Sequence, residues 1–298
     1  MNPSHTNTAP TGPVGPSPGQ HGQEGEEVYQ LLMDLYSTQT RVAALASLSA
    51  KRGDYENMGP LIWNTPGIMT VLLQEIVMVY PYLEPDTFTN EISTRVCHAV
   101  AILQTVASHP DTQIHLVENR LVIFLFPFLN TNKYHGPYEL LTLTALGVIG
   151  ALVKSERPEI IGFLISTEIT QLCLEVMQKA HGLCQTVALY TIQRIIGDDQ
   201  GLEFLCDTYQ RFWAISNVLE LLVAKMLETG NTRLLKHIVR CYNRLADNPR
   251  ARGALRTSLP SPLMDATFQE ALKDDAHTRR VLSMLFVKLS DNVVPSST

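Results

Sequence analysis

Residues 106–116 read VASHPDTQIHL, and residues 245–255 read LADNPRARGAL. Each stretch begins with an apolar helix end, passes through small and polar residues to a proline, and reaches a leucine six positions later. Proline is well tolerated in the first turn of a helix, because the N–H group that it lacks would have no partner within the helix. The two stretches therefore predict the same helix–turn–helix junction at two places in the chain.

Two weaker copies of this junction lie between the first two. Residues 152–158 read LVKSERP, and residues 195–200 read IIGDDQ, without the proline. The four anchors at positions 110, 158, 200 and 249 are 48, 42 and 49 residues apart. A period of about 40–47 residues, with two shorter helices and one long helix in each unit, is typical of armadillo and HEAT repeats. We therefore predict an all-α armadillo-type solenoid of five to six repeats. The alternative is a generic helical bundle whose turns match by chance.

Apolar residues recur at helical spacing along nearly the whole chain, and no segment alternates convincingly in the manner of a strand. The segments with this helical pattern are residues 26–37, 41–48, 67–80, 91–107, 139–153, 168–179, 184–196, 214–228, 232–246 and 276–289. The armadillo domain is therefore expected to span residues 26–290.

The two ends of the chain differ from this domain in composition. Residues 1–25 contain five prolines, five glycines and, Met1 apart, one aliphatic side chain larger than alanine, Val14. Such a segment buries too little surface to offset its ordering entropy, which predicts a disordered tail. Residues 291–298 are expected to form a frayed C-terminus. No run of 18 apolar residues occurs, so no membrane span or membrane partner is expected.

The search for catalytic chemistry finds no recognisable motif. The phosphate-binding GxxxxGK[ST], the nucleophile elbow GxSxG and the zinc motif HExxH are all missing from the sequence. The doublets Asp198–Asp199 and Asp274–Asp275 lie at helix boundaries, where carboxylates cap free N–H groups. The five cysteines lie outside metal-ligand spacing, which favours reduced, packed thiols in the cytoplasm, with the nucleus as the alternative. The sequence therefore predicts a binding protein that is not an enzyme and has no metal or cofactor.

One charge pattern stands out. Residues 231–256 contain seven Lys or Arg residues and a single acidic residue, Asp247. Four of the basic or imidazole side chains follow +4, +3, +4 spacing, which places them on one helix face. They are Arg233, His237, Arg240 and Arg244. This basic stripe is either an ordinary solvated face or a site for a phosphate backbone or an acidic peptide.

Several longer strings resemble a known family. They are LLQEIV at residues 72–77, VASHP at 106–110, LGVIGALVK at 146–154, RLLKH at 233–237 and DNPRAR at 247–252. With them, residues 26–290 resemble the family named "required for cell differentiation", the armadillo-repeat subunit of the CCR/NOT cytoplasmic mRNA deadenylase complex. The resemblance implies a non-catalytic adaptor that docks on the NOT scaffold subunit and recruits the deadenylase to chosen mRNAs.

The resemblance also implies three partner sites. A groove for short linear peptides of mRNA repressors is expected at Leu140, Gly147 and Val187. Pockets for the tryptophans of GW-repeat silencing proteins are expected at Tyr209, Arg211, Arg250 and Ala254. Docking on the scaffold is expected at Asn64, Pro66, Thr70 and Val77. Arg233 keeps a position of the family's basic cleft, which is implicated in nucleic-acid binding, and a homodimer is left open.

The sequence departs from the family pattern at some of these positions. Where the family usually reads Leu-Trp-His-Ser-Phe-Gly, residues 62–67 read Ile-Trp-Asn-Thr-Pro-Gly. Thr70 replaces a usual alanine, and Leu140 replaces an aromatic residue of the peptide groove. His-Gly-Pro at residues 135–137 replaces a Thr-Arg-Pro run. These changes predict a divergent member of the family, with altered partner sites on a preserved fold.

Two classes of function therefore stay open: a deadenylase adaptor, and a direct single-stranded nucleic-acid binder of weak affinity. A third, an importin-like transport adaptor, requires ladders of Trp and Asn along the third helices. The chain has only Trp63 and Trp213, so this third class is set aside.

Overall fold

The computed structural model describes residues 18–83 and 87–290. Within these ranges the chain forms α-helices and short 3-10 helices joined by turns, with no strand. The α-helices are α1 (Pro18–Asp34), α2 (Arg41–Ala50), α3 (Met58–Asn64), α4 (Ile68–Val77), α5 (Asn90–Ser108), α6 (Gln113–Glu118), α7 (Pro137–Lys154), α8 (Pro158–Ile165), α9 (Ile169–Lys179), α10 (Gly182–Gly197), α11 (Asp199–Asp207), α12 (Tyr209–Thr229), α13 (Leu235–Leu245), α14 (Pro249–Ser258), α15 (Ser261–Met264) and α16 (Ala276–Ser290). The 3-10 helices are η1 (Lys51–Gly53), η2 (Tyr80–Tyr82), η3 (Leu121–Phe128) and η4 (Thr232–Leu234).

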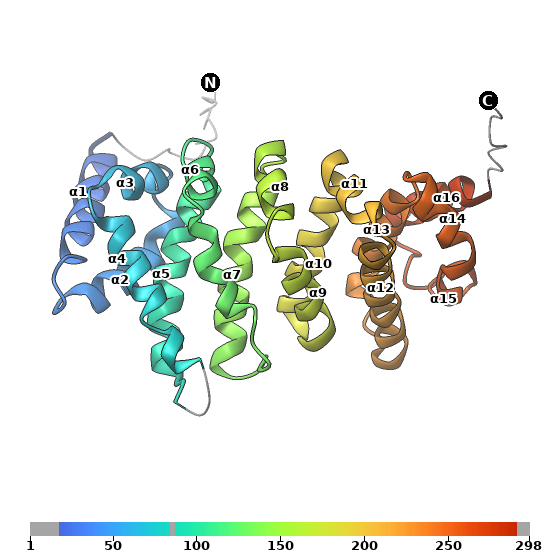
Figure 1. Cartoon of the computed structure of the whole chain (residues 1–298). Helices are drawn as coiled ribbons and strands as arrows, with labels where there is room; N and C mark the ends of the chain where they lie inside the picture. The colour runs from blue at the N-terminus through green and yellow to red at the C-terminus, as the bar shows by residue number, and fades with distance from the viewer. Residues whose placement is uncertain (1–17, 84–86, 291–298) are drawn as a thin grey trace, which may run out of the picture.

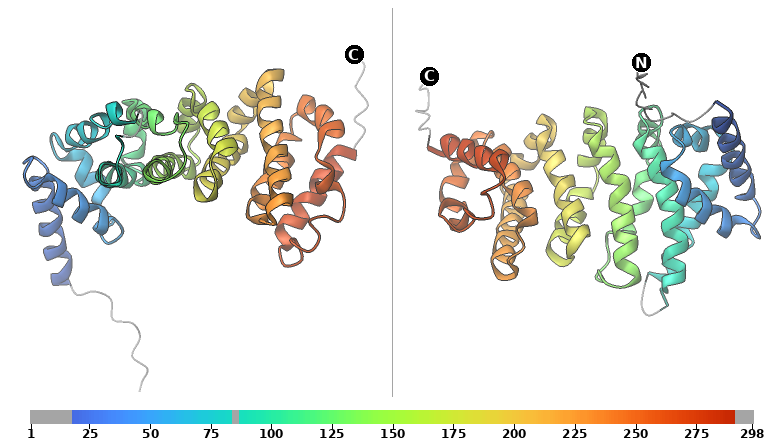
Figure 2. Two further views of the ribbon diagram at one scale, coloured as in Figure 1. Left: turned by 90° about the horizontal axis from the view of Figure 1, so that it is seen from below. Right: turned by 180° about the vertical axis from the view of Figure 1, so that it is seen from behind.

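The helices stack in successive layers along one axis (Figure 1). The last helix of each layer packs on the last helix of the next, in the order α2, α5, α7, α10, α13 and α16. Seen from below, the stack is an arch (Figure 2, left), and from behind these six helices line its concave side (Figure 2, right). The other helices, among them α4, η3, α9 and α12, form the convex side that faces the viewer in Figure 1.

This arrangement confirms the predicted all-α armadillo fold. Five layers contain three helices each, with η3 as the second helix of the third layer, and the first layer contains α1 and α2. The structure thus has six layers, at the upper end of the predicted five to six. Because each layer buries its faces on its neighbours, the hydrophobic core is one continuous cluster from Val28 to Leu285.

Polar contacts between layers recur at the repeat period. Long side chains reach back to a backbone carbonyl or side chain of the preceding layer, at sequence separations of 44 to 48 residues. The donor–acceptor pairs are Tyr80 to Phe124, Lys179 to Asn132, Lys225 to Gln178, Arg244 to Ile196 and Lys288 to Asn243. In all but the first pair the donor belongs to the later layer. These bonds satisfy carbonyl groups that helix ends leave free, and they align each layer on the one before it.

A buried carboxylate ties the first two layers together. Glu75 of α4 is 1% exposed and accepts two bonds from Arg95 of α5, from Nε at 2.6 Å and from a terminal nitrogen at 2.9 Å. Arg41 of α2 approaches the same carboxylate at 3.4 Å. Three helices therefore converge on one buried charge, which fixes α4 against the concave-side helices.

The junctions found in the sequence begin helices as predicted, with one difference. Pro158 and Pro249 are the first residues of α8 and α14. Pro110 instead lies in a turn, and α6 begins three residues later because the N–H groups of Thr112 and Gln113 both donate to the His109 carbonyl. At the junction without proline, Asp198 Oδ1 accepts from the N–H groups of Gln200 and Gly201 and caps α11, as expected for this doublet. Asp275 likewise accepts from the N–H of Thr278 at the start of α16.

All five cysteines are free and buried. Burial raises the pKa of the Cys173 and Cys241 thiols to about 12, so both remain protonated at neutral pH. This agrees with the interpretation of packed thiols. They fill space in the core and are not exposed nucleophiles.

The described residues overlap the predicted N-terminal tail. Helix α1 begins at Pro18, eight residues before the predicted boundary at residue 26. Its first residue is a proline, which suits the first turn of a helix. Residues 1–17 of the predicted tail and residues 291–298 of the predicted C-terminal end lie outside the described residues.

Helix α7 is long and apolar enough to cross a bilayer by length and composition alone. Two bent pairs, α3 with residues 68–82 and α8 with α9, meet the same standard only if each pair is counted as one span. Half of α7 is buried inside the protein, where it packs between α5 and α10. Its hydropathy is therefore accounted for by the core of the third layer. The expectation of no membrane partner stays a prediction.

Candidate functional site

The turn between α3 and α4 contains the first two residues of the predicted docking site, Asn64 and Pro66. Asn64 is exposed, and its Nδ2 donates to the Pro60 carbonyl at 2.9 Å, which ends α3. Pro66 is exposed as well, and its carbonyl accepts a hydrogen bond from the Tyr36 hydroxyl. Gly67 follows with φ +80°, a left-handed conformation that glycine adopts without strain, and it begins α4. The turn that contains the substituted residues is thus held in place by Tyr36 of the first layer.

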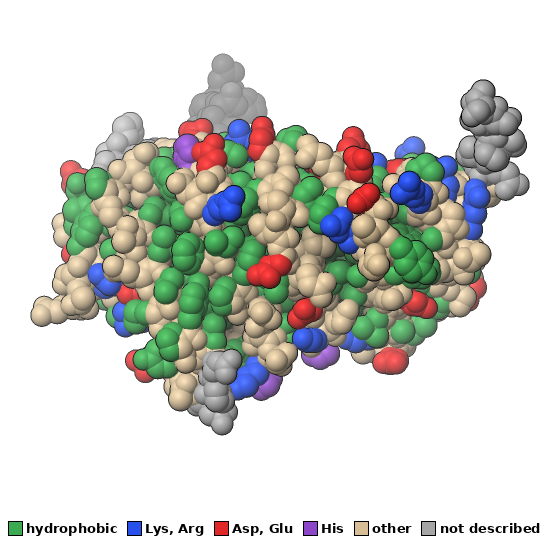
Figure 3. Space-filling view, viewed as in Figure 1, with side chains coloured by type: hydrophobic (Ala, Val, Ile, Leu, Met, Phe, Trp, Pro, Cys, Tyr) green, Lys and Arg blue, Asp and Glu red, His purple; other side chains and the backbone are tan. Residues whose placement is uncertain are grey.

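The remaining docking residues lie on the outer face of α4. Thr70 and Val77 are both exposed and are two helical turns apart, as predicted. The apolar surface continues past them, because Met78, Tyr82 and Ile123 are also exposed, at 46%, 44% and 40%. Figure 3 shows a continuous apolar area over this part of the convex face. We call Val77, Met78, Tyr82 and Ile123 the convex apolar patch. A contiguous apolar area of this kind marks an interaction surface.

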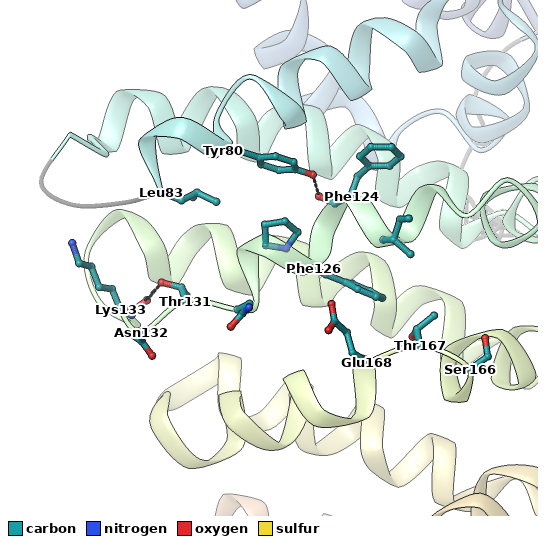
Figure 4. Close-up of a pocket in the computed structure, with 13 residues that line it drawn as sticks. Tyr80, Leu83, Phe124, Phe126, Thr131, Asn132, Lys133, Ser166, Thr167 and Glu168 are labelled. Carbon is teal, nitrogen blue, oxygen red and sulfur yellow. Dashed lines mark hydrogen bonds between the residues drawn. The ribbon is translucent and has the colours of Figure 1, made fainter.

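A hollow adjoins the convex apolar patch (Figure 4). Its volume is about 1110 Å³, and it lies between η2, η3 and the turn that precedes α9. Its apolar wall includes Tyr80, Ile123 and Phe124, and the Tyr80 hydroxyl donates to the Phe124 carbonyl at 2.6 Å. Its polar walls are the loop through Lys133 and the turn before α9, which ends at Glu168. The hollow can take an apolar side chain on one wall and hydrogen-bond a backbone on the others.

Neither this hollow nor η3 was predicted from the sequence. Residues 121–128 read LVIFLFPF, a run of apolar residues with neither helical nor strand spacing. In the structure this run is a 3-10 helix that buries Val122 and Phe126 and leaves Ile123 exposed. The indication in the sequence was the length of this apolar run. Eight consecutive apolar residues are more than one buried face of a helix can contain.

The predicted peptide groove lies on the concave side, between α7 and α10. Leu140 is 46% exposed, and Gly147 lies two turns further along α7. A Cβ atom at Gly147 would lie 3.3 Å from Oε1 of Gln104, so glycine lets that side chain pack closely. Val187 of α10 is half-buried and lies against Gly150 of α7. The structure therefore brings the three predicted residues onto one pair of helices.

A further exposed apolar residue lies near the predicted groove and was not predicted from the sequence. Leu183 of α10 is 55% exposed and precedes Val187 by one turn. The Cys184 thiol lies 3.4 Å from the Glu139 carbonyl, so the N-terminal ends of α7 and α10 are in contact. Leu140 and Leu183 are thus exposed apolar side chains at one end of the groove. Leu183 lies one residue before the predicted segment 184–196, so it was not assigned to a face of that helix.

The predicted tryptophan pockets use α12 and α14. Tyr209 is 75% exposed, and its ring centroid lies 5.6 Å from that of Trp213. The Arg211 guanidinium lies 3.9 Å above the Phe204 ring, donates to the Phe204 carbonyl and pairs with Asp207 at 3.7 Å. The Arg211 side chain is therefore held against Phe204, two positions along α12 from Tyr209.

The second pair of pocket residues lies one turn apart on α14. Arg250 is exposed and Ala254 is half-buried. The helix is capped by Asn248, whose Oδ1 accepts from the N–H groups of Arg250 and Ala251. Arg250 and Ala254 thus form a charged edge beside a small residue, a shape that leaves room for a planar ring.

The basic stripe is smaller than the sequence indicates. Arg233 lies in η4, before α13 begins. His237 has its Nδ1 2.6 Å from Gln193 Oε1, and burial, with the charges of Lys236 and Arg240 nearby, lowers its pKa to about 4. Arg244 pairs with Asp247 and Asp199 and donates to the Ile196 carbonyl. His237 is therefore neutral at pH 7, and Arg244 is part of the contacts between layers.

Arg233 and Arg240 remain as the available cations of the stripe. Neither side chain makes an ion pair or hydrogen bond with the rest of residues 18–83 and 87–290. Asp247 is the single acidic residue within 231–256, but Arg244 has a second acidic partner, Asp199, from the preceding layer. This partner lies 45 residues away in the sequence, beyond the reach of helical spacing.

In the part of the chain that the structure describes, no three His, Cys, Asp or Glu side chains are grouped so as to hold a metal ion. The expectation that the protein has no metal and no cofactor stays a prediction.

Comparison with known proteins agrees with this architecture. Residues 31–289 match the model of the cell differentiation family, Rcd1-like. The chain is 50% identical to the cell differentiation protein rcd1 of Schizosaccharomyces pombe over 267 residues, 90% of this chain and 94% of that protein. It is 43% identical to protein CAF40 of Saccharomyces cerevisiae, over 89% of this chain and 71% of that protein.

Solved structures share the fold. A designed armadillo repeat protein in complex with the peptide (KR)4 superposes with a TM-score of 0.63 at 18% identity, over 88% of this chain and 99% of that one. A computationally designed armadillo repeat protein for modular peptide recognition gives a TM-score of 0.62, also at 18% identity, over 87% and 98%. The family match over nearly all described layers, with the two relatives, confirms the resemblance found in the sequence: the chain belongs to the cell differentiation family, Rcd1-like.

Proposed function

We propose that this protein is a non-catalytic adaptor subunit of the CCR/NOT deadenylase complex, acting in mRNA deadenylation, decay and translational repression. It docks on the NOT scaffold subunit and recruits short linear motifs of mRNA repressors, among them GW-repeat motifs. The family membership and the armadillo fold support this function, since stacked repeats offer extended binding surfaces. We propose the cytoplasm as its place of action, with the nucleus as the alternative.

The observation that carries the proposal is the convex apolar patch, which begins at Val77 on α4, the helix that also carries Thr70. The buried Glu75 fixes this helix from within through its two hydrogen bonds from Arg95. An interaction surface on a rigid element loses little entropy when the partner binds. The hollow beside the patch accommodates a side chain of the partner at the edge of that surface.

Co-purification with the NOT scaffold subunit tests the docking surface. Thr70→Tyr adds bulk to the exposed face of α4, and Val77→Glu places a charge where an apolar contact is expected. Each variant should lower recovery of the scaffold about tenfold or more, which corresponds to a loss of at least about 1.4 kcal/mol. Leu221→Glu on α12 is the matched control, because Leu221 is 40% exposed and Val77 is 39%. Full recovery with both α4 variants would place the scaffold on another surface.

A second function is favoured by the unpaired Arg233 and Arg240, together with Lys236 between them. These side chains can contact the phosphates of single-stranded nucleic acid. Binding should be weak, because two of the four predicted stripe residues carry no available charge and the whole chain has a formal net charge of −6.

Fluorescence anisotropy with a single-stranded RNA and a tryptophan-containing peptide separates the two functions. Charge reversal at Arg233 and Arg240 should weaken RNA binding and reduce the salt slope by about 0.7 for each lost phosphate contact. Peptide affinity should stay unchanged, because capture of an indole depends on burial and stacking near Tyr209. If the wild type and the double variant bind RNA equally well across a salt series, the adaptor function is the one that remains.

A further inference from the structure

The last layer of the stack leaves one helix face uncovered. Helix α16 packs against α13 and α14, and it forms the C-terminal end of the arch (Figure 2). The opposite face of α16 is exposed along its length. Its residues are Arg279, Arg280, Ser283, Met284, Phe286 and Val287, which we call the outer face of α16.

The outer face is unusually apolar for the end of a repeat array. Terminal repeats normally present polar residues, because no neighbour covers them. Here Met284, Phe286 and Val287 are 45%, 36% and 59% exposed. The apolar surface continues into a groove of about 420 Å³ between α16 and the segment that precedes it. Leu263, Phe268, Leu272 and Leu282 line this groove together with Phe286.

The spacing of these side chains suits a helical partner. Arg280, Ser283 and Val287 follow +3 and +4 steps, as do Arg279, Ser283 and Phe286. Ser283 is the small residue at the centre of both rows, with larger side chains on each side. A facing helix can place a side chain over such a position.

The charge of this end of the molecule indicates the kind of partner. The charged residues of the outer face are Arg279 and Arg280, with no acidic residue among its six members, and Asp265 lines the adjoining groove. The guanidinium groups of Arg279 and Arg280 make no ion pair or hydrogen bond with the rest of the described residues. When a partner covers the outer face, Arg279 and Arg280 lie at the edge of the contact. Acidic side chains of the partner would pair with them there.

A second copy of the chain does not fit this surface. A symmetric contact between two outer faces would join two surfaces that each carry Arg279 and Arg280, and the outer face has no acidic side chain that could pair with them. A head-to-tail contact with the first layer would not close, so it would produce a filament. We therefore propose that the outer face of α16 binds an acidic amphipathic helix of another protein, which extends the stack by one layer.

Selection from a helix library tests this proposal. Full-length protein is used to select binders from a displayed library of amphipathic helices about 20 residues long, with all non-apolar positions randomised. The affinity of enriched peptides is then measured by fluorescence anisotropy. Enriched peptides should carry Asp and Glu beside their apolar stripe. Val287→Asp and Arg280→Glu should each weaken them about tenfold, and the Arg280 effect should shrink at high salt.

Leu227→Asp on α12 is the control, because Leu227 is 46% exposed and lies on a different layer. It should leave the affinity within about twofold. Circular dichroism melting verifies that each variant is folded. The proposal is overturned if no enriched peptide responds to Val287→Asp, or if the responsive peptides are basic or neutral.

Two other occupants of the outer face would also overturn it. The first is the chain's own end: a protein truncated after Ser290 would then bind the peptides about tenfold more tightly than the full chain. The second is another copy: sedimentation would then show self-association that Val287→Asp abolishes.

Discussion

Two glycines near the junction of α10 and α11 differ in what a side chain would meet. A Cβ atom at Gly201 would lie 1.9 Å from the Ile195 carbonyl oxygen, a distance that backbone atoms cannot tolerate. A Cβ atom at Gly197 would have no atom within 4 Å. Gly201 therefore permits the close approach of α11 to the end of α10, while Gly197 is not required for packing.

This difference gives a prediction with an internal control. Gly201→Ala should lower the free energy of unfolding by about 2–4 kcal/mol, because the two helices must separate to admit the methyl group. Gly197→Ala should change it by less than about 1 kcal/mol, in the stabilising direction, since alanine favours the helix. Urea unfolding followed by circular dichroism measures both. Equal stabilities of the two variants would contradict the close approach.

His237 predicts a pH dependence of stability. In the unfolded chain its pKa is about 6.5, and in the fold burial, with Lys236 and Arg240 nearby, lowers that pKa to about 4. Between these values the unfolded state binds more protons. The contribution of neutral His237 is therefore complete above about pH 6.5 and is lost as the pH falls through about 4.

Urea unfolding at about pH 7 and about pH 5 should show a loss of about 1–2 kcal/mol in the wild-type protein that His237→Gln reduces. Other titrating groups act equally in both proteins, so the difference between the two losses isolates His237. Identical losses in wild type and variant would show that His237 titrates near its usual pKa in the fold.

The prediction of residue roles from the sequence succeeded where the partner was local. Asp198 and Asp275 were recognised as caps because a cap is defined by the next three residues. The contacts of His237 and Arg244 with Gln193 and Asp199 were not predicted, because those partners lie 44 and 45 residues earlier. The spacing of residues along one helix does not indicate which side chains of the preceding layer contact them.

Among the helices, α4 depends most on a single buried charge. Glu75 faces inward beneath the docking surface and is paired with Arg95 and Arg41. Removing one partner of a buried ion pair leaves the others uncompensated, which is more costly than losing an exposed pair.

Glu75→Gln should therefore lower the free energy of unfolding by about 3 kcal/mol. Glu270→Gln, which removes an exposed pair with Lys273, should change it by less than about 1 kcal/mol. Chemical denaturation of the two variants beside wild type gives the comparison. A small effect at Glu75 would mean that water or another group compensates Arg95.

Long helices with a clear period were predicted well, whereas the short elements α3, α15 and η3 lie outside the predicted segments. The predicted segment 139–153 corresponds to α7, and 276–289 corresponds to α16, each within two residues at either end. The 3-10 helix η3 was missed because its apolar run follows neither helical nor strand spacing. The hollow that η3 borders was missed with it, since a concave surface depends on three segments that only the fold brings together.

For the whole molecule, the proposed adaptor function predicts no intrinsic catalysis. Purified protein incubated with polyadenylated RNA and Mg²⁺ should leave the tail length unchanged, because the described residues contain no metal group and the sequence contains no nucleophile motif. Gel electrophoresis of the RNA gives the readout. Tail shortening that follows the protein through size-exclusion chromatography would rule out the non-catalytic role.

The ladder of contacts between layers also bears on how the chain is made. Each polar bond of the ladder joins residues only 44 to 48 positions apart, so no layer waits for a distant part of the chain. A nascent chain that has released α1 to α5 from the ribosome already contains Arg41, Glu75 and Arg95, the charges that join its first two layers. Each later layer can then pack on a layer that has already formed, as its residues leave the ribosome. The short range of these contacts thus allows assembly to follow synthesis, from α1 toward α16.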